Sequence, residues 1–230
     1  MNNLEVYFDF LSPFSYFAWQ WVYENRHKYK FLLIPVPMGQ VIKAYDTKGP
    51  AEIAPKARFL YKQCLRYAQR HTIPFVCPHQ LPFNSLFPLR MLAAILHLPE
   101  WPVEKRNALA MEFSQHIFGH YWAAGGESLD FAGCAKMLDF NIDKNDQDDV
   151  LSFAESRATS LILKSNVKQA LVHGVFGVPS FLLGQELFWG NDSIIDLELF
   201  LQGKDVYNQN DYNKFLGMRV KLESGANVLS

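Results

Sequence analysis

Leu4-Glu5-Val6-Tyr7-Phe8-Asp9-Phe10, followed by Leu11-Ser12-Pro13, is the stretch of sequence that decides the fold. Residues 4–10 are mostly apolar and include aromatic and β-branched side chains, which favour a strand. The strand cannot continue through Ser12-Pro13, because serine is a good helix N-cap and proline is a good first helical residue. We therefore predict a strand over 4–10 that turns at a sharp corner into a helix over 13–27.

A second strand is predicted over Phe31–Val36, which is apolar throughout. A continuous apolar run of this length is typical of a central strand that is covered on both faces. Together with the first strand and the helix it forms a βαβ unit, whose crossover is expected to be right-handed.

Strand character returns only after Gly174, where the pattern predicts a hairpin with its tight turn at Gly184-Gln185. The next element is a helix, and Asn191 or Asp192 is expected to be its N-cap. The two strands and this helix are expected over 178–183, 186–189 and 193–201.

Residues 39–173 have helical spacing and no convincing strand. The order β-α-β, helical block, β-β-α predicts an α/β protein with a thioredoxin-like fold that carries a large all-helical insertion. We expect 1–38 and 174–204 to form the thioredoxin-like domain, 39–173 the inserted helical domain and 205–230 a C-terminal extension. The helices expected outside the thioredoxin-like part cover 55–71, 84–98, 102–118, 130–140, 146–156, 159–173 and 212–222.

Composition excludes several classes of protein. The chain has 230 residues, a net charge of −1 and mixed charges, so no nucleic-acid partner is expected. No apolar run is long enough to cross a bilayer and no signal peptide precedes the first strand, so we expect a cytoplasmic protein without a membrane partner. His116 and His120 lack the acidic context of a metal site, and no metal is expected.

The three cysteines, Cys64, Cys77 and Cys134, are far apart, and the sequence contains no Cys-x-x-Cys. This spacing argues against a disulfide framework and a dithiol redox centre, so we expect buried or half-buried thiols.

The corner Ser12-Pro13-Phe14-Ser15 is the first candidate for chemistry. In a dithiol oxidoreductase of this fold the corner carries Cys-x-x-Cys, and the helix N-terminus stabilises the thiolate. A serine cannot form a disulfide, but its hydroxyl can donate a hydrogen bond to a thiolate supplied from outside. The alternative is that Ser12 is only an N-cap.

Two further segments are expected to meet this corner. Pro179 opens a strand, and in this fold such a proline often follows a cis bond that leaves the backbone of Val178 free to pair with an extended peptide. The alternative is a trans proline at an edge strand. Asn191 and Asp192 lie at a helix start, where a carboxylate is favoured and an acidic side chain can hold an ammonium group. Together the three segments form a template for glutathione.

The motifs Tyr7 to Tyr16, Val175 to Phe181 and Phe188 to Asp192 resemble those of the 2-hydroxychromene-2-carboxylate isomerases. That family is close to the kappa-class glutathione transferases, within the DsbA-like thioredoxin superfamily. The resemblance covers about residues 4–202.

The resemblance implies that Ser12 is the catalytic residue and holds the glutathione sulfur as a thiolate. The glutathione-binding residues that it implies are Ser12, Pro13, Phe14, Thr47, Val178, Pro179, Asn191 and Asp192. Thr47 stands where the family usually has an asparagine. The substrate-cleft residues that it implies are Asn84, Lys56 and Arg66.

The implied function is a glutathione-dependent isomerase that acts on 2-hydroxychromene-2-carboxylate or a similar aromatic unsaturated 2-oxo acid, by reversible conjugate addition of the thiolate. Glutathione is the expected cofactor, a small aromatic molecule the expected substrate, and a homodimer a candidate assembly. The alternative is a kappa-like glutathione S-transferase that conjugates small electrophiles. A third reading is a catalytically inert or redox DsbA-like protein.

Overall fold

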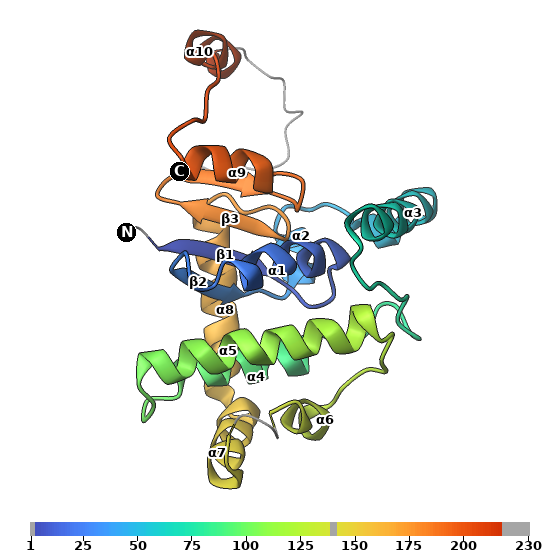
Figure 1. Cartoon of the computed structure of the whole chain (residues 1–230), viewed down its shortest axis with the longest axis vertical. Coiled ribbons are helices and arrows are strands. Elements are labelled where there is room, and N and C mark those ends of the chain that lie inside the picture. The colour runs from blue at the N-terminus through green and yellow to red at the C-terminus, as the bar shows by residue number, and fades with distance from the viewer. Residues whose placement is uncertain (1–2, 139–141, 218–230) are drawn as a thin grey trace.

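The computed structural model describes residues 3–138 and 142–217 and contains a four-stranded sheet (Figure 1). The strand order is β2-β1-β3-β4, where the strands are β1 (Leu4–Phe8), β2 (Phe31–Pro35), β3 (Ser180–Leu183) and β4 (Glu186–Trp189). β1 is parallel to β2, with Val6 opposite Leu33, and antiparallel to β3, with Val6 opposite Phe181. This is the predicted thioredoxin-like order, with the β3–β4 hairpin beside β1.

Successive side chains of β1 point to opposite faces of the sheet and so pack into two different cores. Leu4, Val6 and Phe8 lie in the larger core, together with buried side chains of α1 (Pro13–Glu24). Tyr7 points to the opposite face and packs in a smaller core that includes Ile34 of β2 and Leu182 of β3. The expectation that the second strand is central was wrong, because β2 lies at the edge of the sheet and Leu32 is 43% exposed. The strand is apolar because Phe31 and Leu33 pack into the larger core and Ile34 into the smaller one.

The helical segments between β2 and β3 are organised around α4. Buried α4 packs against α5, α6, α7 and α8. α8 then reaches back to the sheet, where the Asn166 side chain donates to the carbonyl of Pro35 at 2.9 Å. The helical elements after β2 are α2 (Met38–Ala44), η1 (Pro50–Glu52), α3 (Ala54–His71), α4 (Leu86–His97), α5 (Val103–Phe118), η2 (Gly119–Ala123), α6 (Phe131–Lys136), α7 (Lys144–Glu155), α8 (Arg157–Val172), α9 (Ile194–Leu201) and α10 (Gln209–Gly217).

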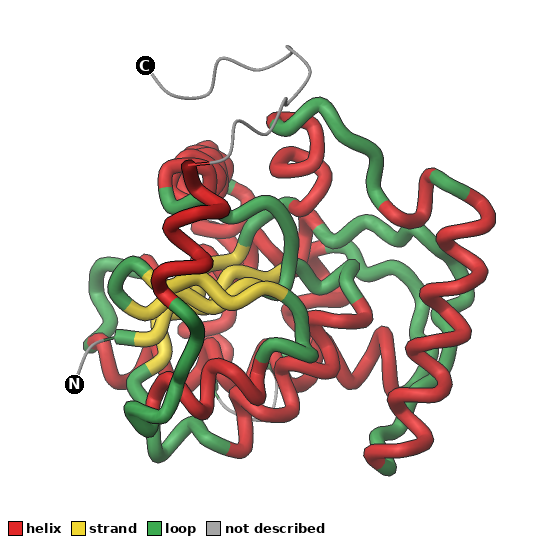
Figure 2. Tube along the Cα trace, turned by 90° about the horizontal axis from the view of Figure 1, so that it is seen from above, coloured by secondary structure: helices red, strands yellow, loops and turns green. Residues whose placement is uncertain are grey.

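The views agree that the strands lie centrally, with α3 at the edge of the molecule (Figures 1 and 2). The division into a thioredoxin-like domain, an inserted domain and an extension stays a prediction. The expected 212–222 helix begins earlier, at Gln209, and its last residues lie outside the described part of the chain.

Several boundaries differ from the predictions for local reasons. α1 ends at Glu24 rather than at 27, because Asn25 closes it with its backbone and side-chain N–H groups bonded to the carbonyl of Trp21. The predicted cap of α9 was wrong: Ser193 is the N-cap, and Asn191 and Asp192 lie in the turn before it. The Ser193 hydroxyl holds this turn by donating to the Gly190 carbonyl at 2.8 Å.

α2 was not predicted as a helix. It follows Pro37 and contains Gly39, both of which are weak helix signals. Its first amide, at Met38, donates to the side chain of Asp9 at 2.8 Å. The helix therefore gains its N-terminal partner from a residue remote in sequence, which no local pattern reveals.

Candidate active site

Ser12 lies at the corner between β1 and α1 and is 3% exposed. Its hydroxyl accepts a hydrogen bond from the Ser15 amide at 3.2 Å, so Ser12 is the N-cap of α1. The same hydroxyl is 3.5 Å from the carbonyl oxygen of Val178, to which it donates a long hydrogen bond. The cap reading is thus correct, and it does not exclude the second role, because a bond this long is readily exchanged for a better acceptor.

The Val178–Pro179 peptide bond is cis, as the sequence suggested, and Val178 faces Ser12. In residues 3–138 and 142–217 the Val178 amide has no backbone partner. The strand that follows begins only at Ser180. The backbone at Val178 is therefore available to an extended peptide, the mode in which a sheet edge is augmented.

The third predicted segment reaches the same place. The Gly190 amide donates to the carbonyl of Pro179 at 2.9 Å, which sets Asn191 and Asp192 beside the cis bond. Asn191 is buried and Asp192 is exposed. Gly190 has a φ of 91° and a Cβ there would lie 2.4 Å from Oδ1 of Asp192, so only glycine allows this turn.

The start of α1 offers polar groups to an anion. Pro13 has no amide hydrogen, and the Phe14 amide has no partner in the described part of the chain. The Ser15 hydroxyl is buried and likewise has no hydrogen-bond partner there. An N-terminus with unpaired donors favours a negative charge, because the helix dipole is positive at this end.

Asp9 is the residue at this corner that the sequence reasoning missed. It is 2% exposed, and its carboxylate accepts hydrogen bonds from the Leu11 amide at 3.0 Å and from the Met38 amide at 2.8 Å. Burial raises the pKa of the Asp9 carboxyl, and these hydrogen bonds oppose the rise. The signal that could have found it is an acidic residue inside the apolar run of residues 4–10, although Glu5 lies in the same run.

For the site residues expected from the inserted segment, no hydrogen bond to Ser12 is found among the described residues. Asn84 is exposed and accepts a hydrogen bond from the Leu86 amide at 3.0 Å, and its neighbour Ser85 is buried. Thr47 is exposed, and its amide donates to the carbonyl of Ile42. Their predicted contacts with glutathione or substrate stay predictions.

The two cations expected in the substrate cleft, Lys56 and Arg66, both lie on α3 and are exposed. Arg66 donates to the side chain of Gln63 at 3.1 Å. Within the described residues, neither cation has a hydrogen bond or ion pair to the Ser12 corner. Their predicted role as partners of a substrate carboxylate also stays a prediction.

A groove of about 700 Å³ lies at the other end of α1, lined by 26–31 and by part of α5. None of the predicted site residues lines it. The Ser12 corner is therefore a separate feature of the molecule, assembled where three chain segments meet.

The cysteines take no part in the corner. Cys64 and Cys134 are buried, and burial raises the pKa of each thiol to about 12. Cys77 is exposed, which corrects the expectation that all three are buried or half-buried, because it lies in the surface loop between α3 and α4. None of the three forms a disulfide.

Comparison with known proteins places this arrangement in a family. Residues 3–202 match the DSBA-like thioredoxin domain. This chain belongs to the DsbA-like thioredoxin family. Within the family match lie the corner, the cis proline and the turn before α9, whereas α10 lies beyond it.

Relatives of this DsbA-like protein include enzymes of two kinds. A 2-hydroxychromene-2-carboxylate isomerase of Sphingobium xenophagum is 25% identical over 209 residues, which are 87% of this chain and 98% of that protein. A glutathione S-transferase kappa 2 of Caenorhabditis elegans is 25% identical over 185 residues, 76% of this chain and 78% of that protein.

A solved structure, of a 2-hydroxychromene-2-carboxylate isomerase, has a TM-score of 0.71 at 24% identity and covers 93% of this chain and 98% of that one. This likeness supports the fold. No helix among the described residues is long and apolar enough to cross a membrane.

Proposed function

We propose that this chain is a glutathione-dependent isomerase that acts on 2-hydroxychromene-2-carboxylate or a similar aromatic unsaturated 2-oxo acid. The observation that carries the proposal is the position of Ser12, at the N-terminus of α1 and 3.5 Å from the Val178 carbonyl. A serine at this position of a DsbA-like fold cannot form a disulfide, but its hydroxyl can donate a hydrogen bond to the thiolate of a bound ligand. The similarity to isomerases over most of the chain supports the reaction type.

The residues at the corner fit a tripeptide thiol. The Val178 amide, which has no backbone partner among the described residues, suits its extended backbone. Asp192 at the nearby turn suits its ammonium group. The buried Ser15 hydroxyl and the Phe14 amide are donors without partners in the described residues, at the end of the helix that favours an anion.

When bound, glutathione supplies a thiolate for reversible addition to the carbon–carbon double bond of the substrate, so that rotation and expulsion of the thiol give the isomer. The protein's part is to keep that sulfur ionised. Ser12 turns its hydroxyl from the Val178 carbonyl to the sulfur, while the Ser15 amide continues to hold the Ser12 oxygen. The dipole of α1 stabilises the same charge.

The test is an isomerisation assay with 2-hydroxychromene-2-carboxylate and glutathione far below the substrate concentration. We expect many turnovers per glutathione, with no loss of free thiol, because the thiol is regenerated. Loss of one thiol per product would overturn the isomerase proposal and favour the kappa-like transferase, to which the C. elegans relative also points. An inert protein would bind no glutathione in calorimetry, and a redox protein would reduce insulin, which the absence of cysteine at the corner argues against.

A further inference from the structure

The outer side of α3 carries a row of four exposed cations, of which only Arg66 is among the predicted substrate-cleft residues. Arg58, Lys62, Arg66 and Arg70 follow one another at intervals of four residues, and all four are exposed. We call this row the basic stripe. Residues four apart lie on one side of a helix, so the stripe runs along α3 for about 18 Å.

The charge of the basic stripe is not balanced locally. α3 contains no acidic residue. None of the ion pairs in residues 3–138 and 142–217 includes a cation of α3. Like charges four residues apart destabilise a helix. An exposed surface that only keeps a protein in solution normally intersperses positive and negative residues. Five of the 22 Lys and Arg residues lie on α3, so this helix has a net charge of +5, whereas the whole chain has a net charge of −1.

Two large apolar side chains accompany the basic stripe. Phe59 is 57% exposed and Leu65 is 56% exposed, although the inner side of α3 offers buried positions at Cys64 and Ala68. At about 100° per residue, Leu65 lies beside Arg58 and Phe59 beside Arg66. The outer side of α3 therefore combines cations with exposed apolar groups.

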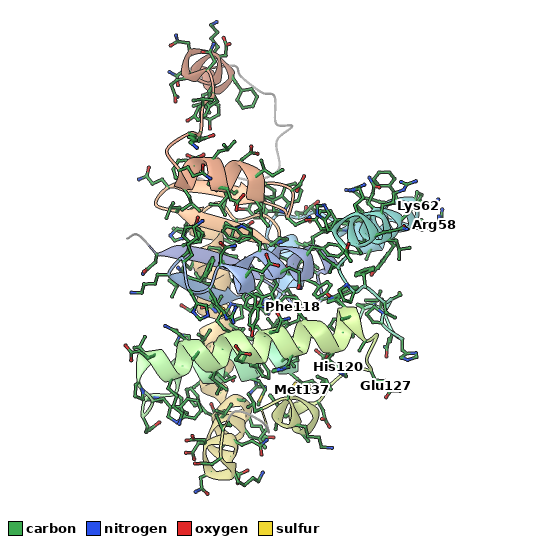
Figure 3. All side chains as sticks on the ribbon, viewed as in Figure 1. Arg58, Lys62, Phe118, His120, Glu127 and Met137 are labelled. Atoms are coloured by element: carbon green, nitrogen blue, oxygen red, sulfur yellow. The ribbon has the colours of Figure 1, made fainter. Side chains whose placement is uncertain are left out.

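The position of α3 leaves this side accessible. The helix lies at the edge of the molecule in two perpendicular views (Figures 1 and 2), and Arg58 and Lys62 are found on its outer side (Figure 3). A flat surface can approach the basic stripe there without meeting the sheet.

We propose that the outer side of α3 docks this protein on the surface of an anionic lipid bilayer. The basic stripe contacts the anionic headgroups, while Phe59 and Leu65 enter the interface. A nucleic acid would use the cations equally, but an exposed aliphatic residue such as Leu65 has no partner on a phosphate backbone. No membrane partner is expected from the sequence because no segment can span a bilayer, and a peripheral contact needs no such segment.

The test is co-sedimentation of the full chain with vesicles of phosphatidylcholine, with or without about one third phosphatidylserine. We expect binding only to the anionic vesicles and a steep loss of binding with added salt, because a basic residue near such a surface contributes roughly fivefold to partitioning. The double variant Arg58→Gln/Lys62→Gln should bind about 25-fold more weakly. The double variant Phe59→Ala/Leu65→Ala should lose the binding that remains at high salt.

The matched control is Lys164→Gln/Lys168→Gln, which removes two exposed cations at the same spacing from α8. It should reduce binding less than threefold. Equal losses in the two charge variants, equal binding to neutral vesicles, or no binding at low salt would overturn the proposal. Tighter binding to a single-stranded oligonucleotide than to the anionic vesicles would instead identify a nucleic-acid surface. Turnover in solution should be unchanged in all three variants, so this test is independent of the proposed function.

Discussion

The Ser12 hydroxyl oxygen lies 3.5 Å from the carbonyl oxygen of Val178, a residue 166 positions further along the chain. This contact joins the start of α1 to the cis proline and, through the bond from the Gly190 amide to the Pro179 carbonyl, to Asp192. The start of α1, the cis proline and the turn before α9 thus form one corner, although none of the three is a binding site by itself. Four of the following predictions test parts of it.

Ser12→Ala should reduce turnover by about 10²- to 10³-fold, the usual effect of removing one donor to a reacting anion. Its stability should fall by only about 1 kcal/mol, because the variant also loses the N-cap of α1. Asp130→Ala is the matched control, since Asp130 caps α6 through the Gly133 amide at 2.7 Å, away from the corner. Steady-state kinetics and urea unfolding measure the two effects. If the two variants lose equal activity, Ser12 is only a cap.

Asp192→Asn should raise the KM for glutathione about tenfold and leave kcat nearly unchanged, because a charge-assisted bond to an ammonium group contributes to binding and not to the chemical step. Asp196→Asn is the control, because Asp196 is an exposed acidic residue near Asp192 but lies on α9 itself, and it should behave like wild type. An equal rise in both variants would indicate a general electrostatic effect and remove Asp192 from the binding site.

Gly177→Ala should weaken glutathione binding roughly fivefold, because the added Cβ would lie 2.6 Å from Nε1 of Trp189 and displace either the indole or the segment that presents Val178. Trp189 is 53% exposed, so its replacement should leave the fold intact. In the double variant Gly177→Ala/Trp189→Ala the alanine at 177 should cost no affinity beyond that of Trp189→Ala alone. Calorimetric titration of all four proteins completes the cycle, and additive losses would show that the contact does not position Val178.

The pH dependence of stability should identify the buried carboxyl of Asp9. Burial raises its pKa above the ordinary value of 3.8, so the unfolded chain ionises first as the pH rises. The folded protein then binds more protons than the unfolded one and loses stability until the pH passes the raised pKa. Asp9→Asn does not titrate, so the free energy of unfolding of wild type relative to this variant should decline as the pH rises from about 4. Urea unfolding across this range measures the difference. An increase with pH would mean that the bonds from Leu11 and Met38 outweigh burial.

Only one of the three thiols should react readily with a disulfide reagent near pH 8 in the folded protein. Burial raises the pKa of the Cys64 and Cys134 thiols to about 12, whereas Cys77 is exposed. Three thiols should react after unfolding in denaturant. The Cys77→Ser variant should show no fast thiol, and a fast thiol in that variant would mean that one of the buried sites opens.

Local chemistry was enough to predict the corner at Ser12, the helix that starts at Pro13 and the hairpin turn at Gly184-Gln185. These features depend on caps, turns and alternation, which involve residues that are close in sequence. The order of the elements then predicted the thioredoxin-like sheet, which the structure and the family match confirm.

Long-range contacts decided the rest. We expected from the sequence that residues 178–179 and 191–192 meet the Ser12 corner, but the contacts that bring them together, between Ser12 and Val178 and between Gly190 and Pro179, were found only in the structure. The bond by which Asp9 holds the first amide of α2 was not expected at all. The same holds for the exposure of the basic stripe, since a helix of this pattern has two sides and only packing decides which of them is covered. Hydrogen bonds and burial between remote segments are settled by how the whole chain packs, and this is why they could be found only in the folded molecule.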